Sequence, residues 1–67
     1  MVKGMIQYIK TVLEKVSFDK YLFEKELKKA LKQLGAEEII EFKNWCYEKF
    51  SIQHGAILNR NFLELAY

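Results

Sequence analysis

The sequence predicts an all-α protein, a small bundle of three helices at about 5–16, 20–34 and 37–50. Apolar residues recur in each range at the spacing of one helical face. The chain contains no proline and only three glycines, so little in it interrupts a helix. Charged residues make up 30% of the chain and divide every apolar run, so no segment reads as a membrane span.

The central segment, 18–35, carries signals for both helix ends. Asp19 suits an N-cap, because its carboxylate can accept a hydrogen bond from a first-turn amide. Phe18 and Phe23 flank that cap at the spacing of a hydrophobic staple. Gly35 follows the last apolar residue, where a left-handed residue often ends a helix. We expect the other helices to pack against the apolar face of this one.

The first helix has a compact apolar stripe and is joined to the central helix by a very short link. A link this short predicts an antiparallel helical hairpin. Residues 1–4 are expected to form a mobile leader, and Met5 is an alternative natural start, which would make those residues an addition. The third helix begins with Glu37 and Glu38, whose negative charges suit a helix N-terminus.

The C-terminal segment, 51–67, leaves two structures open. Leu58, Phe62 and Leu65 share one helical face, which predicts a short fourth helix at about 56–65. A glycine and two asparagines lower the helix propensity there, so the alternative is an extended tail docked on the bundle.

The predicted core consists of the apolar residues at the centres of the three stripes. These are Ile9, Val12, Leu13, Val16, Phe23, Leu27, Leu31, Leu34, Ile39, Phe42, Cys46 and Phe50.

Length and composition restrict the class of protein. The whole chain, 1–67, is expected to form a single domain, with room for only a small core. A net charge of +2 is too small to indicate a nucleic-acid partner by itself. The single cysteine excludes an intrachain disulfide and fits a reducing compartment, so we expect a cytoplasmic protein without a membrane partner.

The sequence contains no motif for catalysis, metal binding or cofactor binding. Cys46 and His54 are the only pair that suggests nucleophilic chemistry. Cys46 lies within an apolar stripe, where a cysteine usually acts as a small buried hydrophobe. His54 is expected on a surface loop. We therefore expect no enzyme, no metal and no organic cofactor.

Aromatic residues make up 15% of the chain, and several lie on the flanks of their stripes. Tyrosine and tryptophan in such positions are typical of protein interfaces. The sequence thus predicts a protein–protein interaction module that self-associates, most simply as a homodimer, although the same patch would also suit a different protein. The candidate interface residues are Tyr8, Ile40, Trp45 and Tyr47.

An alternative function rests on the polar face of the central helix. Four lysines form a stripe there that would suit phosphate groups of a nucleic acid. The candidate phosphate contacts are Lys25, Lys28, Lys29 and Lys32. Two glutamates flank the stripe and dilute its charge, so weak nucleic-acid binding or a regulatory role is the second hypothesis.

Overall fold

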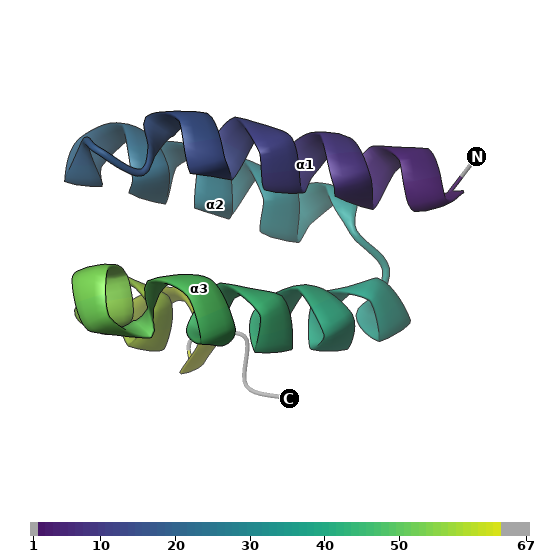
Figure 1. The fold of residues 1–67 in the computed structure, drawn as a ribbon. Helices are drawn as coiled ribbons and strands as arrows, with labels where there is room; N and C mark the ends of the chain where they lie inside the picture. The colour runs from purple at the N-terminus through teal and green to yellow at the C-terminus, as the bar shows by residue number, and fades with distance from the viewer. Residues whose placement is uncertain (1, 64–67) are drawn as a thin grey trace.

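The computed structural model describes residues 2–63, with side chains from residue 4 onward, and these residues form three helices (Figure 1). The helices are α1 (Val2–Val16), α2 (Lys20–Gln33) and α3 (Ala36–Leu63). No strand occurs in the described part of the chain. The all-α prediction is therefore confirmed.

Helix α1 begins earlier than the sequence predicts. Its first residue is Val2 rather than Met5, so residues 2–4, which were expected to form a leader, are helical. Gly4 lowers the helix propensity in this turn but does not end the helix. The preceding residue, Met1, lies outside the described part of the chain.

The link between α1 and α2 confirms the predicted cap but not the predicted staple. The backbone N–H of Leu22 donates to the Asp19 carboxylate over 3.1 Å, so Asp19 is the N-cap of α2. Phe18 is 78% exposed, whereas Phe23 is completely buried. The staple prediction is wrong because Phe23 packs instead against an aromatic partner on α3, Phe50.

The link between α2 and α3 is built around Leu34, which is buried in an extended conformation. Gly35 does not adopt a left-handed conformation, so that prediction is wrong. Instead, the backbone N–H of Gly35 donates to the Glu38 carboxylate over 3.1 Å, and its carbonyl accepts from Ile39. The glycine thus serves the start of α3 rather than the end of α2.

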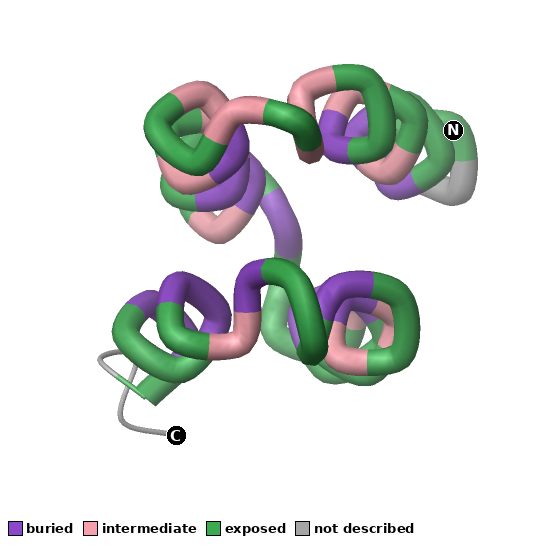
Figure 2. The backbone as a smooth tube through the Cα atoms, turned by 60° about the vertical axis from the view of Figure 1, so that its left-hand side comes forward, coloured by how far each residue is buried: buried purple, intermediate pink, exposed green. Residues whose placement is uncertain are grey.

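The structure does not show a separate fourth helix, because α3 continues past Phe50 to Leu63. Its backbone is non-helical only at His54 (φ −131°, ψ 27°), where the helix bends. The part after the bend runs back beside the first part, as Figures 1 and 2 show. Ring contacts confirm this arrangement, since the ring centroid of Phe62 lies 6.2 Å from that of Phe42 and 5.9 Å from that of Tyr47.

The bundle consists of two layers (Figure 2). Helices α1 and α2 form one layer, and the two parts of α3 form the other. Two ion pairs join α1 to the first part of α3, Lys10 with Glu41 (3.4 Å) and Glu14 with Lys49 (2.8 Å). The short link after Gln33 carries the chain from the layer of α2 to the start of α3 at Ala36 (Figure 1).

Most of the predicted core is buried. The confirmed positions are Ile9, Leu13, Phe23, Leu27, Leu34, Ile39, Phe42, Cys46 and Phe50. Val12, Val16 and Leu31 are half-buried instead, because they lie toward the edges of their stripes. The remaining apolar core positions are Ile6, Ala30, Ile57, Leu58 and Phe62. The last three follow the bend in α3, so the return of that helix completes the core.

Candidate functional site

The four predicted interface residues differ in how far they are exposed. Tyr8 on α1 and Ile40 on α3 are 67% and 64% exposed. Trp45 and Tyr47 are half-buried and pack against the core. Tyr8 and Ile40 thus expose more of their side chains than Trp45 and Tyr47 do.

Trp45 and Tyr47 hold the bundle together. The Trp45 ring packs edge-on against Phe50, and the Lys10 ammonium lies 5.5 Å from its centroid. The Tyr47 hydroxyl donates to the Asn59 side-chain oxygen over 2.6 Å. Trp45 thus joins α3 to α1, and Tyr47 joins the two parts of α3 to each other.

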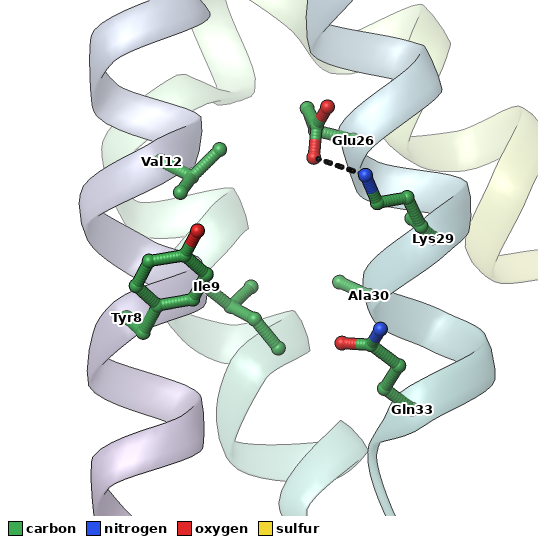
Figure 3. Close-up of a pocket in the computed structure, with 7 residues that line it drawn as sticks. All are labelled: Tyr8, Ile9, Val12, Glu26, Lys29, Ala30 and Gln33. Atoms are coloured by element: carbon green, nitrogen blue, oxygen red, sulfur yellow. Dashed lines mark ion pairs between the residues drawn. The ribbon is translucent and has the colours of Figure 1, made fainter.

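A groove lies between α1 and α2, and Figure 3 shows the side chains along it. Its volume is about 390 Å³. The lining residues are Tyr8, Ile9 and Val12 from α1, with Glu26, Lys29, Ala30 and Gln33 from α2. The walls therefore combine an apolar base with polar groups from α2.

The antiparallel arrangement of the two helices sets the shape of this groove. Figure 3 places Val12 opposite Glu26, and Tyr8 near the level of Ala30. Ala30 is 2% exposed, and its short side chain leaves room above it. Glu26 and Lys29 form an ion pair of 3.6 Å along α2. The groove thus has an aromatic side chain on one wall and both signs of charge on the other.

The four lysines proposed to contact nucleic-acid phosphates are all exposed on the solvated face of α2. They are Lys25, Lys28, Lys29 and Lys32. Lys29 differs from the others because it lines the groove and pairs with Glu26. Tyr21, which is 74% exposed, lies on the same helix. The stripe exists as predicted, but one of its four charges is already paired.

A polar cluster that sequence reasoning missed joins α2 to the last part of α3. The Arg60 guanidinium donates to both oxygens of the Glu24 carboxylate, over 3.0 and 2.8 Å. The buried amide of Asn61 donates to Glu24 over 2.9 Å and to the Ile57 carbonyl over 2.8 Å. One sequence feature could have indicated this cluster. Asn61 is a polar residue within the apolar stripe that contains Leu58 and Phe62.

Hydrogen bonds from Arg60 and then Asn61 lower the pKa of Glu24 to about 2. These bonds favour the ionised carboxylate, which accepts all three of them. The Glu24 side chain is 21% exposed and that of Arg60 is 56% exposed, so solvent screens part of the charge interaction. The main effect of the cluster is to fix α2 against the returning part of α3.

We expect the Glu24 cluster to stabilise the fold in a pH-dependent way. Its folded pKa of about 2 is below the ordinary value of 4.5, so the stabilisation is complete above pH 4.5 and is lost as pH falls toward 2. Urea unfolding of the unmodified protein and Glu24→Gln from pH 7 to pH 2 checks this. The difference in free energy of unfolding between the two proteins should shrink across that window.

Glu48→Gln, at an exposed position on α3, is the matched control. A difference that stays constant down to pH 2 would contradict the linkage.

Cys46 and His54 are both buried, with exposures of 0% and 3%. Burial raises the pKa of the Cys46 thiol to about 12, so it is not a thiolate at neutral pH. The surface-loop prediction for His54 is wrong, because its ring stacks on Phe23 with centroids 4.2 Å apart. Its Nε2–H donates to the Ser17 carbonyl over 2.7 Å. The histidine therefore attaches the bend of α3 to the α1–α2 link.

Two further kinds of feature were sought in the described part of the chain, a metal-binding cluster and a membrane-spanning helix. Among residues 2–63, no three His, Cys, Asp or Glu side chains gather where they could hold a metal ion. Nor does the described chain contain a helix with the length and apolar character needed to cross a membrane. The surface between α1 and α2 is the candidate site that these observations leave.

Comparisons with protein-family models, with curated proteins and with solved structures gave no match.

Proposed function

We propose that this chain is a non-enzymatic, cytoplasmic interaction module that self-associates as a homodimer through the outer face of α1 and α2. The observation that carries the proposal is an uncovered apolar stripe beside the groove. Met5 is 45% exposed, Tyr8 is 67% exposed and Val12 is half-buried. Their spacing puts all three on one side of α1. We call this side, together with the groove, the α1–α2 face.

Association at this face would add apolar burial that the small protomer lacks. A domain of this size buries only about 60% of the surface that its unfolded chain exposes. A tyrosine combines a large apolar ring with a polar hydroxyl, so it tolerates water in the monomer and packs well in a complex. A groove with a small residue at its base can receive such a ring from a partner. Tyr8 is therefore the expected anchor of the contact.

Other exposed apolar residues lie at the opposite end of α1. Phe18, Tyr21 and Ile52 are 78%, 74% and 100% exposed. Gln53 donates to the Ser17 carbonyl, so the α1–α2 link and the bend of α3 meet at this end. The α1–α2 face differs from this end of the bundle because a groove of about 390 Å³ lies beside its exposed side chains. We therefore favour the α1–α2 face.

Weak nucleic-acid binding through the lysine stripe remains the alternative. Its support is the exposure of Tyr21 beside the lysines of α2, since a stacking aromatic and phosphate contacts are what single strands require. Binding to a single-stranded probe that weakens steeply with salt would favour this alternative.

We expect Tyr8→Ala to dissociate the dimer while the protomer stays folded. Loss of an interface anchor costs at least about 2 kcal/mol, which raises the dimer Kd by roughly 30-fold. Light scattering across a concentration series gives the molar mass, and circular dichroism verifies helix content. Tyr21→Ala is the matched control, because it removes the same side chain at similar exposure, outside the groove.

A protein that stays monomeric at high concentration would exclude the homodimer and leave only a different partner. Trp45 and Tyr47 are poor choices for this experiment. Their removal would disturb contacts within the protomer, such as the Tyr47 bond to Asn59.

A further inference from the structure

We propose that a second copy of this chain docks on the α1–α2 face in one specific register, related by a two-fold axis between the copies. In this register Tyr8 of each copy packs on Val12 of the other, and Glu26 of each copy pairs with Lys29 of the other. The inference rests on the proposed homodimer and adds which residues contact one another across its interface.

The apolar part of the register follows from the two-fold relation. In a two-fold contact, every contact between two different residues occurs twice. If residue i of one copy touches residue j of the other, then residue j of the first copy also touches residue i of the other. Tyr8 and Val12 are one turn apart on the same wall of the groove (Figure 3). An axis that passes midway between them places each exposed ring against the half-buried valine of the other copy.

The charged part of the register requires the same axis. Glu26 lies opposite Val12, and Ala30 lies near the level of Tyr8 (Figure 3). The level midway between Tyr8 and Val12 on α1 therefore coincides with the level midway between Glu26 and Lys29 on α2. One axis thus satisfies the aromatic contact and both charge pairs, which is the complementarity that a self-docking surface needs.

The present ion pair between Glu26 and Lys29 leaves both groups free to re-pair. Their atoms are 3.6 Å apart, and the lysine side chain is 61% exposed. An exposed pair of this kind contributes little to the protomer. When a second copy excludes water, the same two groups can form two pairs across the axis.

The other polar surface of α2 does not suit a second copy. Lys25, Lys28 and Lys32 are exposed on it. A two-fold contact there would place lysines against lysines, and like charges repel. Charge therefore favours the groove side of α2 for self-association.

Charge reversal tests the register directly. Glu26→Lys and Lys29→Glu should each raise the dimer Kd by at least tenfold in light scattering, because each sets like charges across the axis. An equimolar mixture of the two variants should recover the dimer mass, since every cross-copy pair is then attractive. The double variant, Glu26→Lys with Lys29→Glu, should also dimerise. Glu48→Lys, at an exposed site on α3, is the control and should dimerise like the unmodified protein.

Each outcome decides between the claims. A mixture that stays monomeric, with both variants folded by circular dichroism, overturns the register. Dimerisation of each single variant at the unmodified Kd places the interface elsewhere and also overturns it, while the homodimer itself stands. An unmodified protein that is monomeric at high concentration overturns the proposed homodimer and, with it, the register.

Discussion

Replacing Phe23 by Ala should lower the free energy of unfolding by about 3–5 kcal/mol. Phe23 is completely buried, and its ring centroid lies 5.0 Å from that of Phe50 and 4.2 Å from that of His54. Truncation removes both ring contacts and leaves a cavity where α2 meets the bend of α3. Folded proteins typically have a free energy of unfolding of roughly 0.05–0.15 kcal/mol per residue. In so small a chain, the loss expected for Phe23→Ala is therefore a large part of the total stability. Urea unfolding followed by circular dichroism measures the change.

Phe18→Ala is the control for this experiment. It removes the same side chain five positions earlier, but Phe18 is 78% exposed, so the stability should change by less than about 0.5 kcal/mol. If the two variants unfold at the same urea concentration, Phe23 does not have the central role that its burial indicates.

The second large effect is expected at Leu27, which is also completely buried. Leu27→Ala should cost about 2–5 kcal/mol, because the lost transfer free energy adds to that of a cavity. Leu31 is only half-buried, so Leu31→Ala should cost clearly less. The sequence alone assigned both leucines to the core and did not separate them. Unfolding midpoints of the two variants give the comparison.

Leu63→Ala serves as the exposed reference, since Leu63 is 74% exposed at the end of α3. Its midpoint should match that of the unmodified protein. Equal losses at all three leucines would contradict the packing described for α2.

Local signals determined α2 well. Its N-cap at Asp19 and its buried face through Phe23 and Leu27 were read from side-chain chemistry and 3.6-residue periodicity. Both are properties of neighbouring residues, so they need no knowledge of the rest of the fold. The same reasoning identified most of the core, because the centres of apolar stripes must find cover in any compact arrangement.

Other predictions failed because they concern distant residues. Phe18 has the spacing of a staple with Phe23, but Phe23 packs instead on Phe50, 27 positions further along the chain. His54 reads as a loop residue beside a glycine, yet the return of α3 buries it against Phe23 and the Ser17 carbonyl. Non-local packing overrides such weak local signals.

The candidate site shows the same difference between what local signals predict and what distant contacts decide. Sequence reasoning selected Tyr8 as an interface residue, and the structure leaves Tyr8 exposed beside the groove. It also selected Trp45 and Tyr47, because flank positions do not reveal whether a neighbouring helix covers them. In the folded chain Trp45 contacts Lys10 and Tyr47 bonds to Asn59.

The sequence by itself determined the helical class, the cap and buried face of α2, and most core positions. Only the tertiary structure decided that α3 folds back at His54, that Glu24 accepts hydrogen bonds from Arg60 and Asn61, and that a groove opens beside Tyr8. The physical reason is that helix periodicity and capping act over about one turn. The direction of a returning helix depends instead on which of several apolar surfaces it covers best.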